Sequence, residues 1–112
     1  MDTTEYQRLA NTFNAGKSVD LSLKHELLAR NALGLVGEAG EVSDYIKKGV
    51  FHLHGVDPEK VKDELGDVMW YVSTLASVLD ISLSDIMEHN INKLTKRYPN
   101  GFTPEDSINR KV

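Results

Sequence analysis

The chain has 112 residues, of which 40% are hydrophobic and 27% are charged, and its formal net charge is −4. The negative charge argues against broad binding to nucleic-acid polymers or membrane surfaces, and the absence of cysteine excludes disulfides and thiolate metal sites. Because no apolar run approaches the ~18 residues that span a bilayer and Met1-Asp2-Thr3 does not begin a signal peptide, we expect a single cytoplasmic domain over residues 1–112.

The N-terminal segment predicts a helix followed by a loop. Asp2 or Thr3 can cap a helix that runs to about Phe13, since the apolar residues of this segment gather on one side. Residues 14–20 are rich in small and polar residues and predict a loop.

A long second helix is predicted to begin between Asp20 and Ser22 and to end near Lys48, where Gly49 is a candidate C-terminal stop. Its apolar residues recur at helical spacing and form one core stripe. The members of that stripe are Leu28, Leu35, Val42 and Ile46.

Three glycines, Gly34, Gly37 and Gly40, fall inside this helix at three-residue spacing. Each is expected to cost about 0.8–1 kcal/mol relative to alanine, so the pattern needs a reason. Close approach of a neighbouring helix is the preferred explanation, and direct approach of the backbone to a ligand is the alternative.

A third helix is predicted after a connector over residues 50–56. Asp57 and Pro58 are a typical helix start, with an acidic N-cap and proline in the first turn, and the helix runs to about Leu79. Trp70 lies well away from the apolar stripe of this helix. We expect so large a ring to be buried against a second subunit rather than to stack on a base.

The fourth predicted helix begins at Ser82, which can cap it with Asp85 at the third position, and ends before Pro99. Beyond it, a turn and one helical turn at Thr103-Pro104 lead into a tail, so that residues 103–112 are expected to be partly mobile. Candidate core residues of the fourth helix are Ile86, Ile91 and Leu94.

Strand signals are nearly absent from the chain. The sequence therefore predicts an all-α fold with four main helices and an antiparallel central pair.

One acidic pattern occurs twice, once on each central helix. Glu38-Ala39-Gly40-Glu41-Val42 is followed 26 residues later by Glu64-Leu65-Gly66-Asp67-Val68. In each copy the two acids are three residues apart, so on a helix they lie nearly one above the other beside the apolar stripe. Packing of the two stripes would bring four carboxylates to one side of the seam.

Four neighbouring carboxylates repel one another unless they are protonated or neutralised by a cation. Their oxygens suit a hard divalent ion such as Mg²⁺, with Mn²⁺ as a substitute. A lone pair of this kind is usually a solvated helix face, but two matched pairs that border the apolar stripe favour a metal site.

These motifs resemble those of a known family. The segments Gly37-Glu38-x-Gly40-Glu41-Val42, Lys47-Lys48 and Asp63-Glu64-Leu65-Gly66-Asp67-Val68-x-Trp70-Tyr71 are similar to the signature of MazG-like nucleotide pyrophosphohydrolases. That family belongs to the all-α NTP pyrophosphatase superfamily. The resemblance extends to Glu5-Tyr6-Gln7 and to Asn90-x-x-Lys93-Leu94-x-x-Arg97-Tyr98-Pro99, so it covers nearly the whole chain.

The resemblance implies a four-helix MazG-like bundle that assembles as a homodimer or homotetramer. It also implies Mg²⁺-dependent cleavage of a nucleoside triphosphate to a monophosphate and diphosphate. The expected catalytic and metal-binding residues are Glu38, Glu41, Glu64 and Asp67. Standard, damaged and alarmone-type nucleotides are all candidate substrates.

Asn90, Lys93 and Arg97 recur on one face of the fourth helix. Spacing alone leaves open whether they form a solvated face or hold phosphate oxygens, and the resemblance favours phosphate binding. With Lys48 they are the candidate phosphate-binding residues. Candidate contacts with the base and sugar are Gln7, Phe13 and Asn14.

Two other functions compete with this one. A helical interaction or regulatory module would carry the same acids as a charged surface, without metal affinity and with an obligate partner. A carboxylate-bridged di-iron bundle fits poorly, because the chain contains no Glu-x-x-His motif to supply nitrogen ligands.

Overall fold

The computed structural model describes residues 1–14 and 21–110, and this part of the chain is helical with no strand. The predicted all-α class and the four main helices are confirmed, while the loop predicted for residues 14–20 lies outside the described residues except for Asn14. None of the described helices combines the length and hydropathy needed to cross a bilayer. The helices are α1 (Thr3–Asn11), α2 (Leu21–Phe51), α3 (Pro58–Val78), α4 (Leu83–Arg97) and the short α5 (Pro104–Ile108).

Three helix starts follow the predicted caps. The side chain of Asp2 accepts a hydrogen bond from the backbone N–H of Glu5, at 2.8 Å. Asp57 caps α3 in the same way and is followed by proline in the first turn. Ser82 caps α4 through a 3.1 Å hydrogen bond from the N–H of Asp85. Local side-chain chemistry therefore sets where these helices begin.

The end of α2 differs from the prediction, because the helix passes Gly49 and ends at Phe51. The chain then turns back sharply, with positive φ angles at Leu53 and Gly55. A Cβ atom on Gly49 would lie 2.6 Å from the carbonyl oxygen of Gly55. Gly49 is therefore needed for the close return of the chain rather than as a helix stop.

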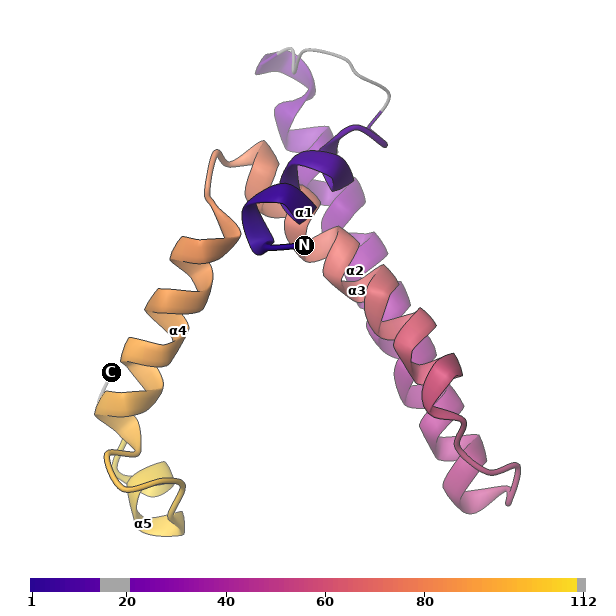
Figure 1. Ribbon diagram of the computed structural model, residues 1–112, viewed down its shortest axis with the longest axis vertical. Coiled ribbons are helices and arrows are strands. Elements are labelled where there is room, and N and C mark those ends of the chain that lie inside the picture. Colours follow the sequence, from indigo (N-terminus) through magenta and orange to yellow (C-terminus); the bar gives the residue numbers. More distant parts are fainter. Residues whose placement is uncertain (15–20, 111–112) are drawn as a thin grey trace.

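The predicted antiparallel central pair is formed by α2 and α3, which lie side by side along most of their length (Figure 1). Helix α1 packs across the C-terminal half of α3. Trp70 of α3 contacts α1, because its Nε1 donates a hydrogen bond to the carbonyl oxygen of Ala10 at 3.1 Å. The indole also packs edge-on against the neighbouring ring of Tyr71. Helix α1 of the same chain thus covers part of the indole, whose burial is intermediate, so Trp70 does not by itself require a second subunit.

Helix α4 diverges from the central pair, so that the chain has the shape of an inverted V (Figure 1). The expected closure of four helices into one bundle is therefore not seen within a single chain. The Gln7 amide of α1 holds the turn at the apex: Nε2 donates to the carbonyl oxygen of Ile81 at 2.8 Å, and Oε1 accepts from the N–H of Leu83 at 3.0 Å. Asp80, in this turn, has a positive φ of 57°.

The glycines of α2 divide into two kinds. A Cβ on Gly34 would overlap the ring of Tyr71 on α3, whereas Gly37 and Gly40 have nothing within 4 Å of the Cβ position. Close helix approach is thus confirmed for Gly34 and is wrong for the other two within this chain.

This contrast predicts opposite effects of the same substitution. Gly34→Ala should destabilise the protein by about 1–3 kcal/mol, because the new methyl group overpacks the contact with Tyr71. Gly37→Ala, the matched control in the same helix, should raise stability by up to about 1 kcal/mol through helix propensity. Urea unfolding followed by circular dichroism measures both changes, and equal effects of the two substitutions would contradict the assignment.

Candidate metal centre

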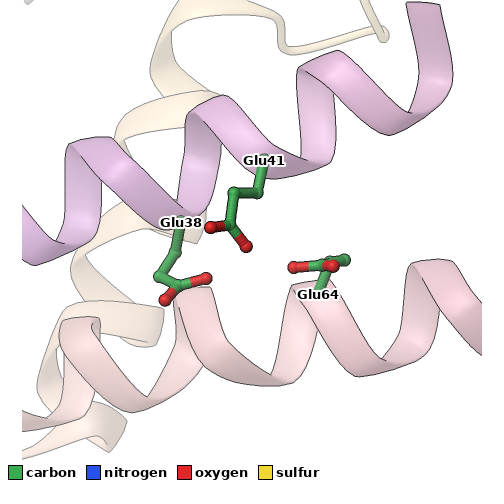
Figure 2. A group of neighbouring side chains, drawn as sticks. All are labelled: Glu38, Glu41 and Glu64. Atoms are coloured by element: carbon green, nitrogen blue, oxygen red, sulfur yellow. The ribbon is translucent and has the colours of Figure 1, made fainter. Parts of the chain in front are cut away.

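Three carboxylates converge in the space between the two central helices. Glu38 and Glu41 extend from α2, and Glu64 extends towards them from α3 (Figure 2). One oxygen atom of each side chain lies within 4.8 Å of an oxygen of the other two. The arrangement follows from the i, i+3 spacing on α2 and from antiparallel packing, which places α3 opposite that pair.

The cluster is electrostatically unfavourable without a cation. The side chain of Glu64 is only 15% exposed. Burial raises the pKa of the Glu64 carboxyl above its usual value, and the neighbouring Glu41 raises it further. Lys60 opposes this increase only partly, because its Nζ lies 3.9 Å from Glu64 Oε1.

Glu38 supplies a second indication that the cluster accepts a cation. Its Oε2 atom is buried and has no hydrogen-bond partner among the described residues. A buried carboxylate oxygen without a partner is costly. An all-oxygen set of this kind fits a hard divalent ion. Two oxygens on one Mg²⁺ are at most about 4.2 Å apart, so small side-chain rotations would bring the three carboxylates into range.

Asp67 is not part of this three-carboxylate cluster. It lies one turn beyond Glu64 on α3 and is exposed. Its negative charge acts on Tyr6 of α1, whose pKa is raised first by burial and then by Asp67. It also adds a small part to the raised pKa of the Glu64 carboxyl, after burial and Glu41. The structure thus brings together three of the four predicted acids and places the fourth beside α1.

The predicted phosphate-binding residues lie at two separate places. Lys48, on α2, pairs with Asp44 at 2.8 Å, and this contact lowers the pKa of the Asp44 carboxyl. Asn90, Lys93 and Arg97 lie on α4, which diverges from the central pair (Figure 1). Nε of Arg97 is buried and lacks a hydrogen-bond partner within the described ranges.

The three candidate contacts for base and sugar differ in their availability. Both polar atoms of the Gln7 amide are engaged at the turn between α3 and α4. Asn14 donates a hydrogen bond to the side chain of Asn11 at 3.0 Å. Phe13 is 77% exposed and is free to contact another group.

Two electrostatic partners of the acidic motifs were missed from the sequence, one of Glu64 and one of Asp67. Lys60 precedes Glu64 by four residues, and this spacing on a helix could have indicated the pair from the sequence. Tyr6 has no comparable local signal, because the packing of α1 brings it near Asp67 from a distant part of the chain.

Comparisons with known proteins identify one family. The profile of the MazG nucleotide pyrophosphohydrolase domain matches residues 25–102, which include both acidic motifs. The "Gene 37 protein" of Mycobacterium phage L5 is 43% identical over 89 residues, which cover 76% of this chain and 78% of the phage protein. No solved structure matches the chain.

The raised pKa of Glu64 predicts how stability depends on pH in the presence of a chelator. The folded state binds the Glu64 proton more tightly than the unfolded state, so stability should fall as pH rises through and above the usual glutamate range. Glu64→Gln removes this dependence. The stability advantage of the Glu64→Gln variant over the wild type should therefore grow between about pH 4 and pH 7.

Thermal unfolding across this pH range is the measurement for that prediction. Glu26→Gln is the control, because Glu26 is an exposed carboxylate of α2 that pairs with Arg30 rather than with the cluster. Parallel stability curves for the wild type and Glu64→Gln would show that Glu64 is not held in an unfavourable charged state.

Proposed function

The chain belongs to the MazG nucleotide pyrophosphohydrolase domain family, and from this membership we propose that it is a metal-dependent nucleoside triphosphate pyrophosphohydrolase. The proposed reaction converts a (deoxy)nucleoside triphosphate and water to the monophosphate and diphosphate. The observation that carries the proposal is the convergence of Glu38, Glu41 and Glu64 at the family's acidic motifs.

We assign these three carboxylates as ligands of Mg²⁺, or of Mn²⁺ in its place, with Asp67 as a fourth acidic residue at the edge of the site. When bound, such an ion neutralises part of the triphosphate charge, polarises the α-phosphate and lowers the pKa of water. Bare carboxylates would repel a triphosphate, so the fit of the cluster to a cation is necessary for substrate binding as well as for chemistry.

Glu38 is the residue we assign to orient the attacking water. Its Oε2 atom is buried and free to accept a hydrogen bond. Attack of the water oxygen on the α-phosphorus forms one P–O bond and breaks the bond to the oxygen that leaves with diphosphate. The proton released by the water passes to a carboxylate of the cluster.

Lys48, Asn90, Lys93 and Arg97 are the proposed phosphate contacts, and Phe13 and Asn14 the proposed contacts of base and sugar. Gln7 is assigned to the turn instead, because its amide is already engaged there. Because α4 diverges from the central pair, its cations reach a carboxylate cluster only if the turn changes or if a second copy pairs with the chain. We include the second route, so a homodimer or homotetramer is part of the proposal.

The alternative of a helical interaction module has one observation in its favour. Many large apolar side chains are exposed, among them Leu33 and Val36 of α2. An interaction module predicts neither Mg²⁺ binding at the carboxylates nor turnover, so one set of measurements distinguishes the two functions.

We predict Mg²⁺-dependent release of diphosphate from a panel of nucleoside triphosphates, and its loss in Glu41→Gln. The loss should exceed about 100-fold, because even residues that only support a metal ligand contribute about 10–100-fold. Asp67→Asn tests the fourth acid in the same assay, and Glu26→Gln controls for loss of an exposed charge on α2.

A second readout for this prediction does not depend on turnover. Mg²⁺ should raise the unfolding temperature of the wild type by binding the folded state, and it should do so less in Glu41→Gln. Near-normal turnover in Glu41→Gln or Asp67→Asn would remove that residue from the site. Absence of any Mg²⁺ effect on the wild type would favour the interaction module.

Arg97→Ala is predicted to weaken binding of a nonhydrolysable triphosphate by about 10–100-fold, because it removes a charge-assisted, bidentate donor. Mg²⁺ affinity should be unchanged, since no metal ligand is lost. Lys96→Ala is the matched control, as Lys96 is an exposed cation of the same helical turn. Calorimetry with each ligand measures both affinities, and an unchanged affinity for the triphosphate would return Arg97 to a solvated helix face.

A further inference from the structure

Lys60 is a cation beside the carboxylate cluster, and the proposed reaction gives it no role. Its Nζ atom lies 3.9 Å from Oε1 of Glu64, which follows it by four residues on α3. The side chain of Lys60 is 52% exposed, whereas that of Glu64 is 15% exposed. Because a long, partly exposed pair at this spacing contributes little to stability, Lys60 is held only loosely beside a carboxylate that is largely buried.

The other paired lysines of the two central helices have closer partners. Lys48 pairs with Asp44 at 2.8 Å, and Lys62 pairs with Glu59 at 3.5 Å. Of the ion pairs among residues 1–14 and 21–110, that of Lys60 is the longest and the only one that involves a carboxylate of the cluster. Lys60 therefore partly neutralises the three carboxylates before a metal ion binds, and it loses little when it leaves them.

Opposite charges lie at the two ends of the cluster. Lys60 lies about one helical turn from Glu64 towards the turn between α2 and α3, and Lys48 lies near the same end of α2. Asp67 lies about one turn from Glu64 in the other direction, where α1 covers α3 (Figure 1). A triphosphate along the seam therefore meets the least repulsion with its diphosphate end towards Lys60 and its uncharged nucleoside towards α1.

A metal ion changes the charge that Lys60 faces. Without the ion, three carboxylates attract the ammonium group; with a divalent ion on them, that attraction is removed and the phosphates become the nearest negative charge. A phosphate oxygen that shares a Mg²⁺ ion with Glu64 would lie at most about 4.2 Å from the Glu64 ligand oxygen. The flexible side chain of lysine can cover such a distance by rotation alone, without movement of α3.

We propose that Lys60 pairs with Glu64 until Mg²⁺ binds and then pairs with the diphosphate end of the substrate. This inference rests on the proposed function, because it needs both the ion and the triphosphate at the cluster. Lys60 keeps its proton throughout. As the bond between the α-phosphorus and the bridging oxygen breaks, the electron pair stays on the diphosphate, and the ammonium group stabilises that charge. Lys60 is therefore assigned as a substrate-binding residue that also serves as the counter-ion of the cluster.

Lys60→Met and Lys62→Met remove the same charge from neighbouring positions of α3, so they separate a specific role from a general change in charge. Lys60→Met should bind Mg²⁺ about 2–5-fold more tightly, the effect of losing a partly exposed competing pair. In saturating Mg²⁺ it should bind a nonhydrolysable triphosphate at least about 10-fold more weakly, because a charge-assisted hydrogen bond is lost. Calorimetry with each ligand measures both affinities.

Two further variants control this measurement. Lys62→Met should change both affinities less than Lys60→Met does, since Lys62 pairs with Glu59 and both side chains are exposed. Lys60→Arg keeps the positive charge and should stay closer to the wild type than Lys60→Met in both affinities.

Amine labelling followed by mass spectrometry gives a test that does not depend on affinity. In the wild type, Mg²⁺ alone should increase the labelling rate of Lys60, because the ammonium group is released from Glu64 and loses its proton more readily near a cation. Addition of the nonhydrolysable triphosphate should reduce the rate below that of the metal-free protein. Lys62 is the internal control and should change in neither step.

Three results would overturn the inference. Equal changes in Lys60→Met and Lys62→Met would show that Lys60 is a solvated cation. Weaker binding of both ligands to Lys60→Met would show that Lys60 supports the cluster instead of competing with the ion. Labelling that does not respond to the triphosphate would exclude the contact with substrate.

Failure of this inference is distinct from failure of the proposed function. Each of the three results can occur in a protein that releases diphosphate in the presence of Mg²⁺. Absence of both turnover and Mg²⁺ binding in the wild type would instead overturn the proposed function, and the inference with it.

Discussion

The antiparallel packing of α2 on α3 is the constraint on which the rest of the structure depends. It holds Glu38 and Glu41 of one helix opposite Glu64 of the other, although these groups repel one another. The contact between Gly34 and Tyr71 keeps the two helices close about one turn from Glu38. Apolar packing along the pair thus positions a cluster of charges that would not assemble on electrostatic grounds.

The helix starts and the acidic cluster could be predicted because their signals are local. Asp57 and Ser82 cap their helices through residues two or three positions further on, and Glu38 and Glu41 share a face through spacing alone. Only one non-local assumption, that α2 packs on α3, was needed to add Glu64. Most of the candidate site therefore follows from the sequence.

What sequence reasoning missed depends on tertiary packing. The cover of Trp70 is α1, a helix 60 residues earlier in the chain, and no periodicity in α3 indicates this contact. Asp67 has the same spacing from Glu64 as Glu41 has from Glu38, yet it lies beside Tyr6 instead of in the cluster. The direction of α4 is set by the hydrogen bonds of Gln7 to the turn. Each of these features depends on which distant segment packs against the residue, and helix propensity carries no information about such packing.

The open position of α4 separates the two kinds of charge that the proposed reaction needs. Lys93 and Arg97 lie on α4, which diverges from the central pair that carries Glu38, Glu41 and Glu64 (Figure 1). Because Gln7 holds the turn between α3 and α4, a phosphate contact from α4 needs either a change in that turn or the α4 of another chain. In the second case, carboxylates that bind a cation and cations that bind phosphate would come from different chains. Dilution that separates the chains would then lower nucleotide affinity and leave Mg²⁺ affinity unchanged.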